Sequence, residues 1–242
     1  MLFKRSTFRS ACTGVIFATP FFQRAVQRII GGPRLETVRF SDGQLFDCFT
    51  SEKYYWLREF YEYDEREELE SCLTPESVLF DVGAHVGFWE IVLAARCGHI
   101  HAFEPSPQNL LRLTSNINQN HLANVTIVPK AVSEYSGALY IAENGSMSQI
   151  SPAGLSVDAI TLDQYVSRHG TPDIVKLDIE GYAGAALHGM RATLASRKPI
   201  LFIEVHGAEE LASCHAVLEE FGYVAAVLNK PRYPYRIKFT IS

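Results

Sequence analysis

Short apolar runs alternate with helix-like patterns after residue 75, and this alternation constrains the fold more than any other feature. Apolar strands separated by helices form a mostly parallel sheet that helices cover on both faces. Too few residues join the last two strands for a helical crossover, so we expect these strands to be antiparallel. The predicted strands span 78–82, 99–104, 125–132, 174–178, 200–205, 223–228 and 236–241; helices are predicted at 87–97, 107–120, 184–195 and 208–221, and a hairpin or loop near 143–146.

The residues before this alternation differ in character, so we divide the chain into segments 1–74 and 75–242. Residues 35–50 hold two apolar runs around Asp42-Gly43, which is typical of a β-hairpin. Residues 54–70 are rich in aromatic and acidic side chains and predict a helix with one solvated face. One α/β domain with an N-terminal extension fits 242 residues better than two full domains.

The net charge of −5 hides an uneven distribution of charged residues. Six basic and no acidic residues precede Glu36, whereas the rest carries 16 basic and 27 acidic residues, a net charge of −11. An acidic domain argues against a nucleic-acid partner. The five cysteines are scattered without a CxxC pair, so we expect neither a zinc finger nor a disulfide framework, and we favour a reducing, cytoplasmic location.

The basic N-terminal segment leaves three interpretations open. Residues 10–23 carry no charge, but they are too few to span a bilayer and Pro20 interrupts them. The segment fits a terminal helix packed on the domain, an amphipathic stretch in peripheral contact with an anionic membrane, or a cleaved targeting peptide.

A glycine-containing turn after the first predicted strand carries the strongest functional signal. Asp81 lies at the strand end, Gly83 permits a tight turn, and Gly87 opens the next helix with exposed N–H groups. In a doubly wound sheet such a turn lies at the carboxyl edge, where ligands bind. Glu104 ends the second strand, where an acid is placed to hold ribose hydroxyls; the alternative is a glutamate that only caps the next helix. The GxGxxG pattern of dinucleotide-binding proteins is absent from this turn.

The turn begins a series of short segments: DVGAHVG (81–87), FEPSP (103–107), AVS (131–133), TLD (161–163), KLDIEG (176–181) and IEVH (203–206). In this order they resemble FkbM-type S-adenosylmethionine-dependent methyltransferases over about residues 75–210. The resemblance implies an α/β, Rossmann-like class I methyltransferase fold, with a seven-stranded, mostly parallel sheet, an antiparallel last strand and helices on both faces. It also implies S-adenosylmethionine as the cofactor and methylation of a hydroxyl oxygen.

The resemblance further implies where the cofactor binds. The glycines of the turn would cradle its methionine part, the acid that ends the second strand would hold its ribose, and the serine after the third strand would lie near its adenine. A histidine stands in the turn where asparagine is more typical of the family. The cofactor-binding residues implied are Asp81, Gly83, His85, Gly87, Glu104, Ser133 and Asp178.

The same resemblance places the chemistry at the ends of the fourth and fifth strands. Asp178 and Glu180 can steady the sulfonium charge, bind a divalent ion or accept a proton from the acceptor hydroxyl. Glu204 and His206 are two residues apart, so their side chains share a face of the strand. His206 is the best candidate for a general base because its unperturbed pKa is near neutrality; the alternative is a polar residue that supports the turn. We expect Lys176 to be an ion-pair partner.

We therefore predict an S-adenosylmethionine-dependent O-methyltransferase acting on a small-molecule or glycan acceptor, such as a sugar, a glycolipid or a small hydroxylated metabolite. The sequence establishes no metal, and we assign none. A non-catalytic scaffold that binds the cofactor is one alternative. A nicotinamide-dependent oxidoreductase is another, although it predicts the GxGxxG pattern that the chain lacks.

Overall fold

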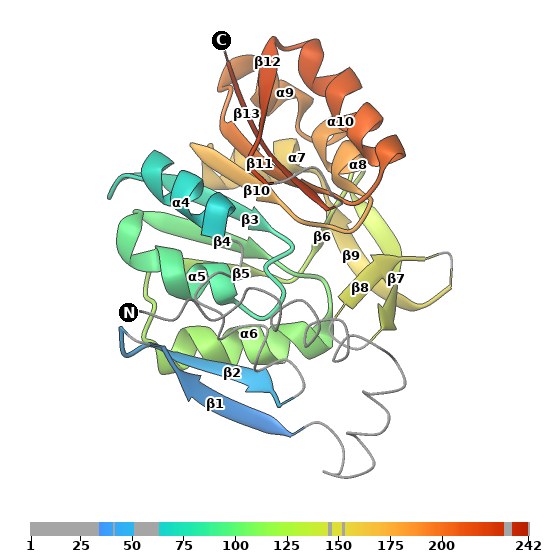
Figure 1. Cartoon of the computed structure of the whole chain (residues 1–242). Helices are drawn as coiled ribbons and strands as arrows, with labels where there is room; N and C mark the ends of the chain where they lie inside the picture. Colours follow the sequence, from blue (N-terminus) through green and yellow to red (C-terminus); the bar gives the residue numbers. More distant parts are fainter. Residues whose placement is uncertain are drawn as a thin grey trace, which may run out of the picture.

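The computed structural model describes residues 34–40, 42–50, 63–144, 147–151, 153–229 and 234–241. A central sheet lies between helices, with the β1–β2 hairpin at one end of the molecule (Figure 1). The basic N-terminal segment and the aromatic residues 51–62 lie outside these ranges, so the three interpretations of the segment stay predictions. Within the ranges, no helix is long and apolar enough to cross a membrane.

The central sheet has seven strands in the order β12-β13-β11-β10-β3-β4-β5. The strands from β11 to β5 are parallel, and β13 is antiparallel to both of its neighbours. The mostly parallel sheet and its antiparallel closing strand are thus confirmed. The strands are β3 (Val78–Val82), β4 (His99–Phe103), β5 (Val125–Val128), β10 (Ile174–Leu177), β11 (Ile200–Val205), β12 (Tyr223–Val227) and β13 (Tyr235–Ile241).

Alternate strand residues feed two hydrophobic clusters, one on each face of the sheet. Leu79 and Phe202 belong to the cluster beneath α5, whereas Phe80 and Ile203 belong to the cluster that includes residues of α7 to α10. Successive strand residues point to opposite faces, so Asp81, two residues after Leu79, projects toward α5. The helices are α4 (Tyr63–Cys72), α5 (Phe88–Leu93), α6 (Pro107–Gln119), α7 (Leu162–His169), α8 (Ala183–His188), α9 (Arg191–Ser196) and α10 (Ala208–Glu219).

A four-stranded sheet of order β6-β9-β7-β8 follows β5 and differs from the prediction. The run 125–132 was predicted as one strand, but it turns at Pro129 and Lys130, where the Lys130 N–H donates to the Val128 carbonyl. The residues after this turn form β6, which pairs with β9 and does not continue β5 in the main sheet. The hairpin expected near 143–146 is present as β7 and β8. The sheet consists of β6 (Ala131–Val132), β7 (Gly137–Asn144), β8 (Met147–Ile150) and β9 (Leu155–Ile160).

The helix predicted at 184–195 is two helices, α8 and α9, separated by Gly189 and Met190. Gly189 packs so closely on the chain after β6 that a Cβ at this position would lie 2.1 Å from the Ser133 carbonyl oxygen. The contact with the second sheet therefore coincides with the interruption of the helix, and periodicity alone does not reveal such a contact.

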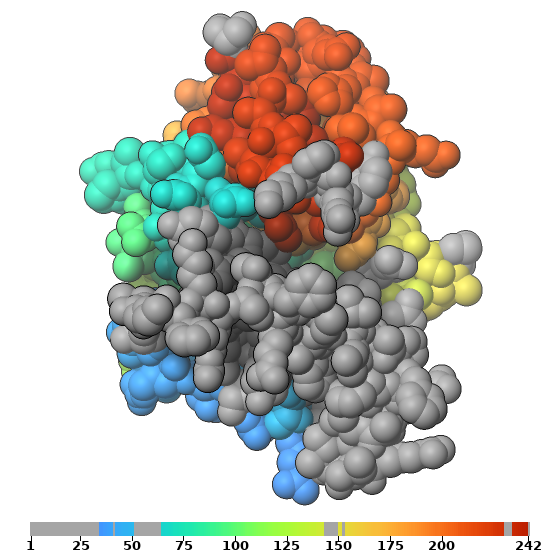
Figure 2. Space-filling model, viewed as in Figure 1, coloured from blue at the N-terminus to red at the C-terminus, as the bar shows by residue number. Residues whose placement is uncertain are grey.

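The N-terminal hairpin, β1 (Leu35–Arg39) and β2 (Leu45–Phe49), has the predicted turn and packs on the main domain. Asn116 of α6 accepts the Asp47 N–H at 2.6 Å and donates to the Val86 carbonyl at 2.7 Å. The hairpin is thereby tied to the glycine turn after β3. In Figure 2 the hairpin (blue) lies at the opposite end of the visible face from the C-terminal elements (orange to red). The domain boundary at residue 74 stays a prediction.

Candidate active site

The turn between β3 and α5 joins the carboxyl ends of three neighbouring strands. Gly83 has φ +95°, and a Cβ on it would lie 2.0 Å from the Asp178 carbonyl oxygen, so the turn packs directly on the chain after β10. The N–H groups of Gly83 and Ala84 both donate to the Phe103 carbonyl of β4 at 3.0 Å. His85 has φ 52°, a region that favours asparagine, aspartate and histidine among residues with a side chain. Histidine is therefore compatible with the backbone conformation of this turn.

Glu104 follows β4 and is almost fully buried beside this turn. Its carboxylate accepts the N–H groups of His85 at 2.9 Å and Ser106 at 2.8 Å, and the side-chain amide of Asn109 at 3.3 Å. Burial raises the pKa of Glu104 to about 7, although these three hydrogen bonds act in the opposite direction. Glu104 thus contacts the start of α6, as the capping alternative expects, and also holds the glycine turn.

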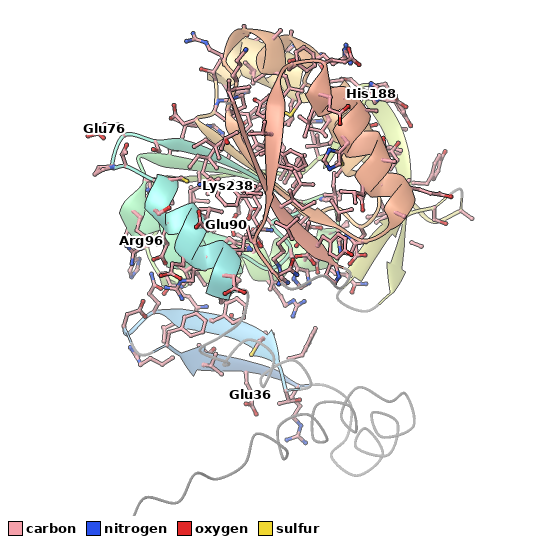
Figure 3. The ribbon with its side chains drawn as sticks, turned by 45° about the horizontal axis from the view of Figure 1, so that its top comes forward. Glu36, Glu76, Glu90, Arg96, His188 and Lys238 are labelled. Atoms are coloured by element: carbon pink, nitrogen blue, oxygen red, sulfur yellow. The ribbon has the colours of Figure 1, made fainter. Side chains whose placement is uncertain are left out.

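Asp81 and Glu90 form a fully buried pair of carboxyl groups between β3 and α5. Burial raises the pKa of both groups, and the charge of Asp81 raises that of Glu90 further. Lys176, with 1% of its surface exposed, lies opposite Asp81 in the sheet register, and its ammonium lies 5.3 Å from the centre of the Trp89 ring. Figure 3 shows Glu90 within the body of the molecule, unlike Glu76 at its edge.

The four predicted catalytic residues lie together around the Nε2 atom of His206. The nearest carboxylate oxygens of Glu204, Glu180 and Asp178 are 3.5, 3.7 and 4.0 Å from it. Lys176 contacts the other oxygen of Asp178 at 3.4 Å, which confirms the expected ion pair. Glu180 has φ 36°, and a residue with a side chain is strained in this region. Strain of this kind is often found at functional sites.

The carboxylates around His206 change its protonation. Burial disfavours the charged imidazole, but the side chains of Glu204 and Glu210 and the charges of Glu180 and Asp178 outweigh this effect and raise the pKa of His206 to about 10. The imidazole therefore carries a proton at neutral pH in this arrangement. A general base has to be neutral before it accepts a proton, so these neighbours oppose that role for His206.

Sequence reasoning missed two residues that hold the His206 cluster. Glu210 of α10 accepts the backbone N–H groups of His206 at 2.8 Å and Ala183 at 3.0 Å. Arg236 of β13 donates to Glu204 at 3.0 Å. The spacing of four residues between His206 and Glu210 was a usable signal. The contact with Arg236 depends on the register of β11 and β13, which the sequence pattern does not specify.

Ser133 lies at the junction of the two sheets, and its side chain is fully buried. Its N–H donates to the Ile160 carbonyl at 3.1 Å, and its own carbonyl lies against Gly189. Its proximity to the adenine of a cofactor stays a prediction.

The strand order, the antiparallel β13, the glycine turn after β3 and the acids at the ends of β4, β10 and β11 define a Rossmann-like class I methyltransferase fold. The chain belongs to the FkbM methyltransferase family, because the model of the methyltransferase FkbM domain matches residues 81–235. This match includes all the predicted site residues. The family supports S-adenosylmethionine as the cofactor.

Individual known methyltransferases resemble the chain in sequence or in fold. The hexuronic acid methyltransferase AglP of Haloferax volcanii is 28% identical over 154 residues, which cover 60% of this chain and 62% of AglP. The crystal structure of an FkbM methyltransferase from Methylobacillus flagellatus superposes with a TM-score of 0.56 at 18% identity, over 78% of this chain and 54% of that chain. M. jannaschii TYW2, crystallised with AdoMet, has a TM-score of 0.53 at 15% identity, with 88% and 89% coverage. The chain thus spans less than two thirds of AglP and of the FkbM structure.

Proposed function

We propose that the protein transfers the methyl group of S-adenosylmethionine to an oxygen atom of a sugar or of a molecule that carries one. The observation that carries the proposal is the convergence of Asp178, Glu180, Glu204 and His206 beside the glycine turn. The likeness to a hexuronic acid methyltransferase supports a sugar acceptor, and makes an acidic sugar the first one to test.

The residues around the glycine turn fit the cofactor. Bound S-adenosylmethionine would supply an electrophilic methyl group. A carboxylate offers about four acceptor positions, and three protein N–H donors contact Glu104, so an ionised Glu104 can still accept a ribose hydroxyl. Asp81, at the carboxyl end of β3 beside the turn, would provide a carboxylate for the ammonium group of the methionine part. The turn itself places Gly83 against Asp178, so cofactor and acceptor sites adjoin.

For a hydroxyl acceptor, we assign proton acceptance to Glu180 instead of His206. Glu180 is close to His206, and its side chain is 28% exposed, whereas that of Glu204 is 8% exposed and held by Arg236. A hydroxyl attacks effectively only as its proton is removed, and a positioned base contributes about 10²- to 10⁴-fold to the rate. Asp178, Glu204 and His206 then position the acceptor for in-line attack, which supplies much of the remaining catalysis.

A transfer assay tests the function. The full chain is incubated with S-adenosylmethionine labelled with ¹³C in its methyl group, together with a hexuronic acid, its neutral hexose counterpart or a glycan containing either. We expect a labelled methyl ether or ester in NMR spectra of a sugar product. Protein that binds S-adenosylhomocysteine but labels no sugar would contradict the acceptor class and favour the scaffold alternative.

The variant Glu180→Gln tests the proton acceptor. Glu76→Gln is the matched control, because Glu76 is an exposed acid distant from Glu180 in the sequence. We expect kcat for a hydroxyl acceptor to fall about 10²-fold or more, with unchanged affinity for S-adenosylhomocysteine. A carboxylate acceptor carries no proton to remove, so its methylation should be nearly unaffected. An unchanged kcat for a hydroxyl acceptor would remove Glu180 from this role.

A further inference from the structure

The side chains of Asp178, Glu204 and His206 form a cup that matches the first coordination shell of a metal ion. One ligand atom from each lies within 4.8 Å of the others. The Nε2 atom of His206 is 3.5 Å from Glu204 and 4.0 Å from Asp178, longer than a good hydrogen bond. Two ligand atoms that bind one ion at about 2.0–2.2 Å lie about 3–4 Å apart, so the spacing suits a shared ion.

The second oxygen of each carboxylate is held from outside the cup. Lys176 contacts Oδ2 of Asp178 at 3.4 Å, which leaves Oδ1 directed at His206. Arg236 contacts Oε2 of Glu204 at 3.0 Å, which leaves Oε1 directed at the same nitrogen. Lys176 is fully buried and Arg236 largely so, and both thus orient the ligand carboxylates as outer-shell partners do in metal sites.

Glu210 completes this outer shell on the far side of the imidazole. Its Oε2 atom lies 3.7 Å from Nδ1 of His206 and also accepts the backbone N–H of His206 at 2.8 Å. Metal-binding histidines commonly direct their second ring nitrogen at a carboxylate, which fixes the orientation of the ring. Glu210 lies on the side of the ring where such a carboxylate is found; its 3.7 Å distance from Nδ1 exceeds a hydrogen bond, so it holds His206 through the backbone N–H.

The charges of the side chains around His206 also favour a metal ion. Four carboxylates surround one imidazole, those of Asp178, Glu180, Glu204 and Glu210. Lys176 contacts Asp178, and Arg236 contacts Glu204 and also, at 3.3 Å, the buried Glu65. A bound metal ion would displace the imidazole proton; the four carboxylates and two cations would then leave a formal charge of −2, which one divalent cation would balance.

We propose that Asp178, Glu204 and His206 bind a divalent first-row metal cation of the Mn²⁺ type. Two carboxylate oxygens suit a hard cation, and the imidazole nitrogen favours Mn²⁺ over Mg²⁺. Three protein ligands leave coordination positions open for oxygen atoms of the acceptor. This role in acceptor binding rests on the proposed function, whereas binding of the ion does not. No metal could be assigned from the sequence, because the outer contacts of Lys176, Arg236 and Glu210 depend on the tertiary structure.

Titration of the full chain with MnCl₂ after treatment with EDTA tests the site, by calorimetry and by the EPR signal of free Mn²⁺. We expect one site per chain, with weaker binding of Mg²⁺. Asp178→Asn and His206→Asn should each weaken Mn²⁺ binding more than tenfold, whereas Glu209→Gln, an exposed acid beside Glu210, should leave it unchanged. Thermal unfolding verifies that each variant is folded. Binding of S-adenosylhomocysteine is a second check for His206→Asn and Glu209→Gln only, because Asp178 is itself a predicted cofactor-binding residue.

Three results would overturn the proposal. One is wild-type protein that binds S-adenosylhomocysteine but no Mn²⁺ at up to about 1 mM, roughly the weak end of protein sites for hard cations; this would leave the proposed function intact. The second is Mn²⁺ affinity that neither His206→Asn nor Asp178→Asn changes. The third is equal affinity for Mg²⁺ and Mn²⁺, which would contradict the imidazole ligand. Folded protein that binds Mn²⁺ but not S-adenosylhomocysteine would instead contradict the proposed function.

Discussion

Glu104 should make the affinity for S-adenosylhomocysteine depend on pH near neutrality. Burial raises the pKa of Glu104 to about 7, and its ionised carboxylate accepts a hydrogen bond from a ribose hydroxyl more strongly than the protonated acid does. A group with this pKa is ionised to about 10% at pH 6 and about 90% at pH 8. If only the ionised form binds the ribose, the association constant should rise about tenfold between these two pH values.

Calorimetry of the full chain with S-adenosylhomocysteine at pH 6, 7 and 8 measures this rise. Glu104→Gln should bind more weakly and lose the pH dependence, because an amide does not titrate in this range. Glu76→Gln, an exposed acid, should retain the wild-type profile. Wild-type affinity that is constant from pH 6 to 8, or a tenfold rise that persists in Glu104→Gln, would refute the assignment of the ribose to Glu104.

Three further predictions concern stability. In urea denaturation, the free energy of unfolding of Gly83→Ala should be about 2–5 kcal/mol lower than that of the wild type, because the new Cβ would meet the Asp178 carbonyl. Gly181→Ala shares the positive φ but has open space around the new Cβ, so its loss should be smaller. Equal losses would contradict the contact argument. Lys176→Met should lower the free energy of unfolding by about 3–5 kcal/mol, because it removes the cation beside buried carboxyl groups. Adding Asp81→Asn should restore part of this loss. An unchanged free energy of unfolding in Lys176→Met would show that the cation is dispensable. Burial and the charge of Asp81 raise the pKa of Glu90, so its contribution to stability is present at low pH and lost as pH rises through that pKa. The Tm of Glu90→Gln should therefore rise relative to that of the wild type as pH increases. Parallel Tm profiles would refute the raised pKa.

The main sheet could be predicted because its strands are apolar on both faces. The run 200–205 matches β11 at both ends, and β3 also begins and ends where the pattern places it. The second sheet could not be predicted fully, because one of its strands, β6, has only two residues and continues the apolar run of β5. Strand assignment there depends on which partner strand is available, and this is a tertiary property.

The candidate site could likewise be predicted only in part. His206 and Glu204 could be found because they are two residues apart and so share a face, and the structure brings them within 3.5 Å. Glu90 was missed although it is the charged residue of an otherwise apolar helix, α5. The protonation of His206 could not be predicted, because its pKa is set by carboxylates from several elements, including Glu210 of α10. The unperturbed pKa of histidine, near neutrality, suggested that His206 is a base. The carboxylates around it in the folded protein instead favour a protonated imidazole or a metal ligand.

Binding of S-adenosylhomocysteine to the full chain at pH 8 tests the account most directly. We predict one site per chain, affinity that falls in Glu104→Gln, and affinity that Glu180→Gln leaves unchanged. Folded wild-type protein that binds no S-adenosylhomocysteine would contradict the cofactor site, and the methyl transfer proposed here with it.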